Sequence, residues 1–358
     1  YRGRRMISFT DSRQGTARIA AKIQQDSERN RVRGLVFRRV NSRSGGSNAA
    51  QIEKIRTEIE VLSPVATAPG IAELISGKQA EINRLLTPLP HPFDEAARWL
   101  ATNEADISKW MFDYYHRADP DLFRDGTGQL QLARMALARE FARRPKRLNS
   151  LETMGLVAIQ YPKLEAVTQP PPVPLQTPMS LDDWKNFLKI CLDFHVRENT
   201  FVDLPESWKK WGGNRIFRKW LLPPTSQQRP TSTIKKWPQS RSGGRQNRLV
   251  RLLACSLKLD PKAPQGRDTI DALLRAAWDA LCTCGLLQVS TSGRFLAFND
   301  MAFIRPVKAW LCPVTRRVLD VTFKGVTPYL PEEPTPETSE CQEIAPVRPV
   351  RQGFRYRI

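Results

Sequence analysis

Residues 246–305 hold the most restrictive pattern in this 358-residue chain. Leucines at helical spacing are followed by a turn at 261–266 and by a second run of apolar residues at the same spacing. Two short apolar segments then flank the small polar residues at 291–293, a composition typical of a hairpin turn. The pattern predicts two consecutive helices closed by a β-hairpin.

Two helices followed by a hairpin form the second half of a winged-helix domain, and we assign residues 246–312 to a winged-helix-like domain. The hairpin of such a domain can dock on DNA or on protein, and the residues leave both possibilities open. Upstream, the apolar run from Leu156 to Ile159 indicates a short strand. Ser180 is placed to cap a helix, with Asp183 three residues further on.

The length predicts two or three compact units. We expect an α/β chain with a large α-helical insertion, divided at breaks rich in proline, glycine and serine. The expected parts are a strand–turn–helix opening at 1–45, a helical insertion at 46–150, a strand with a proline-rich connector at 151–180, a helix with a basic tryptophan-rich stretch at 181–245, the winged-helix-like domain at 246–312, and an extended, partly disordered tail at 313–358.

Positive charge dominates the composition. Lys and Arg total 56 against 36 Asp and Glu, a formal net charge of +20. Such a balance points to phosphate backbones first and to anionic membrane surfaces second. Because no apolar run approaches the ~20 residues that span a bilayer, and no signal peptide opens the sequence, we expect a cytoplasmic protein with no membrane partner. Its six scattered cysteines suit a reducing compartment.

From Ser207 to Leu259 the sequence has 13 Lys or Arg and no Asp or Glu, together with four of the nine tryptophans. Cations among aromatic rings suit single-stranded nucleic acid, because bases stack on the rings while phosphates meet the charges. The competing interpretation is a solvated surface whose tryptophans belong to the core. The candidate nucleic-acid-binding residues in this stretch are Lys209, Lys210, Trp211, Arg215, Arg218, Lys219 and Trp220.

A second candidate site lies at 6–15, MISFTDSRQG, where a strand ends in a polar turn that opens a helix expected from Thr16 to about Val40. Hydroxyl groups, backbone N–H groups and the helix N-terminus can hold one phosphate of a strand. An arginine can add a charge-assisted contact. The candidate residues are Thr10, Asp11, Ser12 and Arg13. Since the sequence begins at Tyr1 and leads directly into this strand, we expect an internal piece of a larger protein.

The hexapeptide at 9–14, FTDSRQ, resembles the FSDSRQ form of motif IV, which opens the second RecA-like lobe of large DEAD/DEAH-box superfamily 2 helicases. Segments 150–157 (SLETMGLV) and 310–313 (WLCP) look like parts of the very large bacterial helicases of anti-phage defence systems, of the Druantia or DISARM type. The motif is short, whereas the looser likeness extends over most of the chain. Such helicases carry long insertions between motif IV and motifs V and VI.

The resemblance implies an ATP-dependent DNA helicase or translocase, in which motif IV grips the tracking strand. Its partners would be single- or double-stranded DNA, the remaining helicase lobes and other defence subunits. ATP and Mg²⁺ would bind mainly outside this chain, because the sequence has no phosphate-binding loop. Gly70 and Gly77 precede Lys78 at the wrong spacing, and Gln79 stands where the Mg²⁺-binding hydroxyl belongs. Motif VI is also absent, so this stretch alone should not hydrolyse ATP.

Other polar clusters have ordinary structural explanations. Asp94-Glu95 mimics part of a DEAx box but is better explained as the acidic first turn of a helix. Cys282 and Cys284 lack the second pair that structural zinc requires. The sequence thus favours a helicase fragment with no catalytic residue and no metal ligand of its own. The alternatives are a non-enzymatic winged-helix protein that binds nucleic acid or regulates, and a helical scaffold for protein partners.

Overall fold

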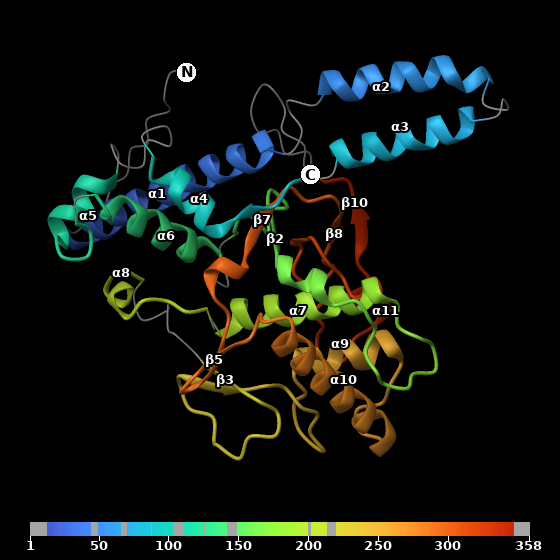
Figure 1. Ribbon diagram of the computed structural model, residues 1–358. Coiled ribbons are helices and arrows are strands. Elements are labelled where there is room, and N and C mark those ends of the chain that lie inside the picture. The colour runs from blue at the N-terminus through green and yellow to red at the C-terminus, as the bar shows by residue number, and fades with distance from the viewer. Residues whose placement is uncertain are drawn as a thin grey trace.

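The computed structural model describes residues 13–43, 49–65, 70–86, 88–102, 111–124, 126–141, 149–199, 202–212 and 220–346. Within these ranges, helices surround three small β-sheets, so the chain is mixed α/β as expected. Figure 1 shows a layer of helices from the N-terminal part of the chain above a second group of helices and strands. One large core of buried apolar side chains runs through both. None of the described helices combines the length and the apolar character needed to cross a membrane.

The upper layer consists of α1 (Arg13–Arg43), α4 (Phe93–Leu100), α5 (Asp113–Ala118) and α6 (Gly128–Phe141). The long helix predicted after the polar turn is therefore confirmed. The second half of α1 packs on α4 and α6 through aliphatic side chains such as Val32 and Leu35. A carboxylate on α6 fixes this packing, because Glu140 accepts hydrogen bonds from Arg29 Nε at 2.7 Å and from Arg33 Nε at 2.9 Å.

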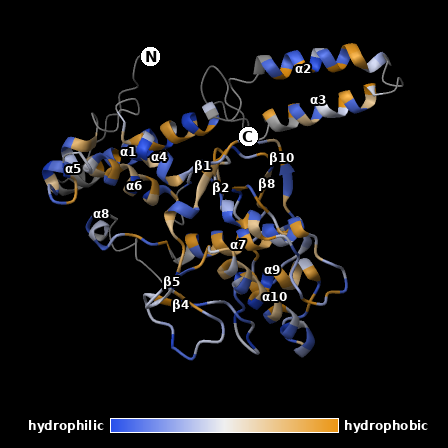
Figure 2. Ribbon diagram, in the orientation of Figure 1, coloured by the Kyte–Doolittle hydropathy of each residue, from blue (hydrophilic) through white to orange (hydrophobic). Residues whose placement is uncertain are grey.

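A helical arm projects from the upper layer (Figure 1). It consists of α2 (Ala49–Leu62), the 3₁₀ turn Ser63–Val65 and α3 (Ile71–Leu86). Ile52, Ile55 and Ile82 form a small core that is separate from the main one. In Figure 2, hydrophobic and hydrophilic residues alternate along both helices, as expected when one face is packed and the other exposed. The prediction that 46–150 is mainly helical is confirmed for its described part.

A three-stranded sheet joins the two groups. It consists of β1 (His91–Pro92), β7 (Ala302–Ile304) and β2 (Ala158–Gln160), with β7 in the middle and both pairings antiparallel. β2 confirms the strand predicted near Leu156. Apolar residues of the sheet face the helical layer, where Phe303 stacks on Phe141 with ring centroids 4.4 Å apart. After β2, the 3₁₀ turn Pro162–Ala166 leads into the proline-rich connector.

The lower group begins with α7 (Leu181–Asn199), whose predicted cap is confirmed: Ser180 Oγ accepts a hydrogen bond from Asp183 N at 3.0 Å. Next come a 3₁₀ turn (Glu206–Trp208), α8 (Lys209–Gly212), β3 (Trp220–Leu222), β4 (Ile234–Lys236), α9 (Arg248–Leu257) and α10 (Pro264–Thr283). The predicted hairpin is formed by β5 (Gln288–Ser290) and β6 (Gly293–Phe295). A further 3₁₀ turn, Phe298–Asp300, leads to β7.

The hairpin does not stand alone. It belongs to a sheet of order β4-β3-β6-β5, in which Leu221 of β3 lies opposite Arg294 of β6. Gly293 is required there, because its φ is +141° and a Cβ would lie 2.9 Å from the Leu221 carbonyl oxygen. The helix–helix–hairpin pattern is therefore extended by α7 and β3, which lie before residue 246. The sequence pattern missed this part because β3 is only three residues long.

Residues after 312 differ from the expected extended tail. β8 (Ala309–Leu311) lies between β9 (Val318–Leu319) and β10 (Gln342–Ile344) in a third sheet, and α11 (Pro336–Ser339) precedes β10. Backbone hydrogen bonds, such as Cys341 N to Gly325 O at 2.8 Å, fasten the segment to the fold. Its prolines and glutamates suggested disorder, but backbone pairing and buried residues such as Phe323 hold it in place up to residue 346. Residues 347–358 lie outside the described part.

Candidate nucleic-acid interface

The motif IV-like residues lie at the edge of the described structure. Thr10, Asp11 and Ser12 fall outside it, and only the backbone of Arg13 is described, as the first residue of α1. The first half of α1 carries Ile19 and Ile23, which are 37% and 46% exposed. These two side chains share one face of the helix at a spacing of four residues. The described part of the chain leaves that apolar face uncovered.

The tryptophan-rich stretch is only partly described. Arg215, Arg218 and Lys219 lie outside the described residues, and of Lys209 only the backbone in α8 is described. Lys210 is exposed, and its Nζ lies 3.3 Å from Asp119 Oδ2. Of the candidates in this stretch, the structure therefore brings together Lys210 and its neighbour Trp211.

Trp211 is half-buried rather than free for stacking on a base. Its indole Nε1–H donates to Asp119 Oδ2 at 3.0 Å, which lowers the pKa of that carboxyl group. The ring packs against Tyr115 and Phe123, with centroids 5.0 and 5.7 Å away. These contacts fasten α8 to the upper helical layer. The competing interpretation, in which the tryptophans belong to the core, fits this residue best.

The other tryptophans of the acid-free stretch are either buried in the core or half-buried. Trp208 is 3% exposed and Trp237 is 2% exposed, and Trp237 donates its indole N–H to the Leu274 carbonyl at 2.8 Å. Both are core residues. Trp220 on β3 is half-buried, with its ring edge-on to Phe295 of the hairpin. Among the candidate tryptophans, Trp220 keeps the most suitable position for stacking on a base.

Three arginines of this stretch lie at the start of α9. Asn247 caps the helix, because its Oδ1 accepts a hydrogen bond from Leu249 N at 2.9 Å. Arg245, Arg248 and Arg251 follow one another at three-residue spacing. Burial, together with the nearby charges of Arg245 and Arg248, lowers the pKa of Arg251. From 220 to 251 the chain has seven Lys or Arg and no acid, so this segment carries a strong positive charge.

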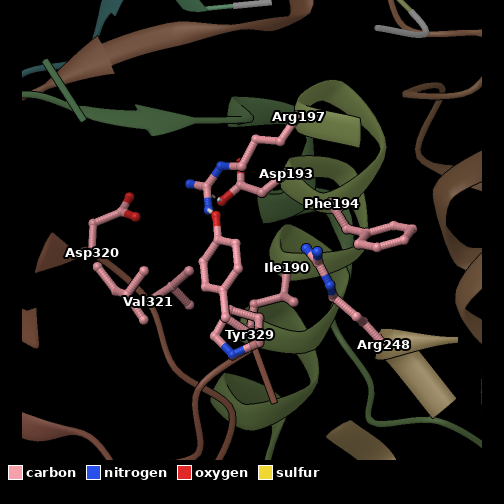
Figure 3. A pocket seen from close by; sticks show the side chains of 10 residues that line it. Ile190, Asp193, Phe194, Arg197, Arg248, Asp320, Val321 and Tyr329 are labelled. Atoms are coloured by element: carbon pink, nitrogen blue, oxygen red, sulfur yellow. Dashed lines mark hydrogen bonds and ion pairs between the residues drawn. The ribbon is translucent and has the colours of Figure 1, made fainter. Parts of the chain in front are cut away.

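Arg248 also borders a small cavity of about 20 Å³, room for one water molecule (Figure 3). Its guanidinium lies 5.6 Å from the centre of the Tyr329 ring. Arg197, on α7, donates from Nη1 to the Tyr329 hydroxyl at 2.8 Å. Asp193 and Asp320 complete the polar side of the cavity. The cavity therefore links the arginines of α9 to a buried group of charges.

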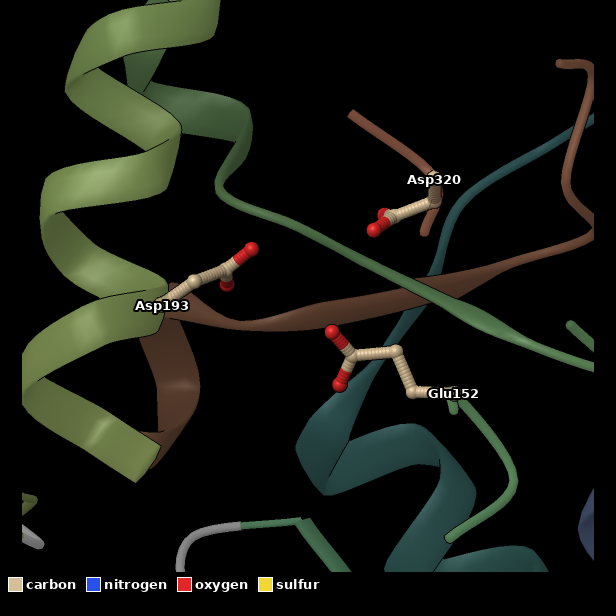
Figure 4. A group of neighbouring side chains, drawn as sticks. All are labelled: Glu152, Asp193 and Asp320. Carbon is tan, nitrogen blue, oxygen red and sulfur yellow. The ribbon is translucent and has the colours of Figure 1, made fainter. Parts of the chain in front are cut away.

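That group contains Glu152, Asp193 and Asp320, which converge from three segments far apart in the sequence (Figure 4). Their oxygens lie within 4.8 Å of one another, close enough to share a cation. Lys189 and Arg197 already supply the positive charge that these carboxylates need. Lys189 Nζ lies 2.7 Å from Asp193 and 3.0 Å from Asp320, while Arg197 pairs with Glu152 and Asp193. The arrangement is a buried ion-pair network that joins the three segments.

The network shifts the pKa values of Lys189 and Asp320 in the directions that favour their charged forms. Burial opposes the charged form of Lys189, but Asp193 and Asp320 hold its pKa above the usual value. Burial likewise opposes ionised Asp320, but Lys189 and Arg197 hold its pKa below the usual value. Both groups therefore stay charged at neutral pH. The spacing of Lys189, Asp193 and Arg197, four residues apart on one helix, was visible in the sequence, but their pairing with Glu152 and Asp320 was not, because these lie far away along the chain.

The exposed face of α10 has a different character. Asp268, Arg275 and Asp279 are exposed on it, and the half-buried Ala272, Ala276 and Ala280 lie beside them. With the proline-rich connector at 166–173, this face lines an open groove of about 640 Å³. The second helix of the pair thus offers carboxylates, one arginine and small side chains rather than a concentration of positive charge.

The remaining sequence candidates take structural positions. Asp94 and Glu95 lie in the first turn of α4, as expected. Burial raises the pKa values of the Cys282 and Cys284 thiols, so both stay protonated. Burial also lowers the pKa of His195 to about 3, so the ring is neutral at pH 7.

No family model matches the chain, and no curated protein and no solved structure matches it either.

Proposed function

We propose that this chain is the nucleic-acid-engaging part of an ATP-dependent superfamily 2 DNA helicase or translocase. The observation that carries the proposal is the group of arginines at the start of α9, Arg245, Arg248 and Arg251, in a segment (207–259) that itself contains no Asp or Glu. A concentration of positive charge suits a phosphate backbone, which carries one charge per nucleotide. The helicase assignment rests on the resemblance at 9–14, and a role in anti-phage defence rests on the resemblance of segments 150–157 and 310–313.

The order of elements supports a winged-helix-like unit. Helix α7, strand β3, helices α9 and α10 and the strands β5 and β6 follow one another, and β6 lies between β3 and β5. A winged helix has this order of helix, strand, two helices and hairpin. The unit would hold nucleic acid, while the motif IV-like residues Thr10, Asp11, Ser12 and Arg13 would contact the tracking strand.

ATP and Mg²⁺ would be bound by parts of the protein outside this chain. The residues closest to a phosphate-binding loop do not fit a nucleotide. Lys78 lies in the middle of α3, and its Nζ is 2.6 Å from Glu58 Oε2 on the facing helix of the arm. The charge of Lys78 is therefore used in an ion pair within the helical arm. We expect no ATPase activity from the purified chain, with or without DNA, and turnover by that chain would contradict the assignment.

The binding test is a salt titration. A fluorescent single strand of about 20 nucleotides and a duplex of about 20 base pairs are titrated with the purified chain between about 50 and 200 mM salt, conditions over which phosphate contacts weaken steeply (roughly tenfold or more for several contacts). We expect the logarithm of affinity to fall linearly with the logarithm of salt concentration. Absence of binding at the lowest salt would refute the proposed function.

A further inference from the structure

Arg251 is a buried arginine with no carboxylate at ion-pair distance in the described part of the chain. The residue is 8% exposed, and its Nε has no hydrogen-bond partner among the described residues. Glu332 is the one acid among these residues whose charge favours the guanidinium, and burial outweighs that effect. A buried charge without a close partner is destabilising, because it loses hydration and gains little in return. Its position is therefore unexplained by the fold itself.

The surroundings make the position less favourable still. Arg248 is one helical turn away and Arg245 lies just before the helix, so both add positive charge near Arg251. The N-terminus of α9 adds the positive end of the helix dipole. Asn247 already accepts the Leu249 N–H, so a ligand at this end of the helix would be held mainly by guanidinium groups. Three like charges gathered at one point favour binding of an anion.

We propose that Arg245, Arg248 and Arg251 form a binding site for a phosphate group of a nucleic-acid backbone. The proposal rests on the proposed function and specifies where on the winged-helix-like unit the nucleic acid is held. Guanidinium groups suit this ligand because their planar N–H groups match phosphate oxygens in pairs. Bound phosphate supplies the close counter-charge that Arg251 lacks.

The same reasoning makes the exposed face of α10 a weaker candidate for the nucleic-acid face. Asp268 and Asp279 would repel a phosphate backbone there, and the exposed Arg275 between them offsets only part of this negative charge. Asp271 is occupied, since its Oδ1 accepts hydrogen bonds from the backbone N and the hydroxyl of Ser240, both at 2.7 Å. The backbone of the nucleic acid therefore meets the start of α9 rather than the length of α10.

Glu332 competes for the proposed site. It pairs with Arg245 at 2.5 Å, and the side chains of Glu332 and Arg245 are 59% and 73% exposed. An exposed pair of this kind is weak and is easily exchanged for another anion. The Glu332 carboxylate thus competes with phosphate for the same arginines, and its removal should strengthen binding.

The test compares four variants of the whole chain by salt-titrated binding of the same duplex and by thermal unfolding. Arg251→Met and Arg248→Gln should each weaken binding about tenfold and reduce the salt slope by about 0.9 for each phosphate that is no longer neutralised. Glu332→Gln should strengthen binding. Lys262→Gln, on the exposed turn between α9 and α10, removes the same charge elsewhere and should change neither affinity nor slope beyond a small general effect.

Thermal unfolding separates a binding role from a structural one. Because Arg251 has no close counter-charge, Arg251→Met should melt at the same temperature as the natural chain or higher while it binds more weakly. If Arg251→Met fails to fold, Arg248→Gln and Glu332→Gln decide, since both replace partly exposed residues. Binding by both that equals the natural chain would overturn the proposal.

Two further outcomes have distinct meanings. If the natural chain binds no duplex, the proposed function itself fails. If it binds duplex but every arginine variant binds as well as Lys262→Gln, only the assignment of the site fails. Inorganic pyrophosphate at matched ionic strength is the second probe. Saturable pyrophosphate binding that depends on Arg251, together with duplex binding that does not, would assign the site to free phosphates and overturn the backbone assignment.

Discussion

Trp211 donates its indole N–H to Asp119 Oδ2 at 3.0 Å, and this bond ties the short helix α8 to the loop that follows α5. The ring also contacts Tyr115 and Phe123 of the upper layer. A residue held in this way stabilises the junction between two parts of the chain. Its aromatic face is engaged by protein, which leaves little of it for a base.

Trp211→Ala should therefore destabilise the chain by about 2–3 kcal/mol, whereas Trp211→Phe, which keeps the ring contacts, should lose about 1 kcal/mol with the hydrogen bond. Urea unfolding measures both. Salt-titrated single-strand binding should be unchanged in the two variants. Loss of about 1–3 kcal/mol of single-strand affinity by Trp211→Ala at unchanged stability would instead assign it a stacking role.

His195 should make stability depend on pH. Burial lowers its folded-state pKa from 6.5 to about 3. Below pH 6.5 this histidine is protonated in the unfolded chain but stays neutral in the folded chain. Its contribution to stability is therefore complete above pH 6.5. That contribution is lost as the pH falls toward 3, by up to about 1.4 kcal/mol per pH unit. The ring stacks on Trp237 at 4.9 Å, so His195→Phe is the suitable variant. It should show a shallower loss of melting temperature between about pH 6.5 and 4, and parallel curves would contradict the assignment.

The buried ion-pair network should be sensitive to loss of one cation. Arg197→Met leaves Glu152 and Asp193 buried with less positive charge, and it should destabilise the chain by about 3–5 kcal/mol. Lys185→Met is the matched control, because its partner Glu165 is 83% exposed and such a pair contributes about 0–1 kcal/mol. Chemical unfolding of both variants gives the comparison. Equal effects would show that the network is not a stabilising joint.

The helical arm should unfold without the rest of the chain. Ile82→Asp places a charge in the small core shared with Ile52 and Ile55, where an unpaired carboxylate is strongly unfavourable. We expect reduced helical circular dichroism and faster amide exchange in α2 and α3, with the main thermal transition unchanged. Leu74→Asp, at a position that is 48% exposed, is the control. A lower main transition in Ile82→Asp alone would mean that the arm supports the body.

Local chemistry made much of the fold predictable. The Ser180 cap, the helical spacing of leucines in α9 and α10 and the small residues before Gly293 each act within a few positions of the chain. Pairing between distant segments was not predictable in this way. Strand β3 has three residues, and only its register with Arg294 makes it part of the hairpin sheet. The segment after residue 312 was misjudged for the same reason, because the pairing of β8 with both β9 and β10 depends on the folded chain.

The candidate site, too, was predictable from the sequence only where local features define it. The absence of acids from 207 to 259 was visible in the sequence and led to the region of the positive surface. The sequence could not tell which tryptophans are buried, since Trp208, Trp237 and Trp220 occur in similar contexts. The arginines of α9 could have been predicted from the sequence as neighbours, because they follow a capping asparagine at helical spacing. The positions of Tyr329 and Glu332 could not be predicted, since only the folded C-terminal segment brings these residues to the start of α9.

The pairing of β2 with β7 has an evolutionary consequence. Gln160 and Ala302 lie opposite each other on adjacent strands, so the chain leaves the joining sheet at one point and returns to it at the same point. Everything between them, including helices α7 to α10 and the hairpin sheet, is a single excursion with neighbouring ends. Neighbouring ends are what a domain insertion requires, but Lys189 and Arg197 inside the excursion pair with Asp320 and Glu152 outside it. The excursion and these flanking residues therefore have to change together in evolution.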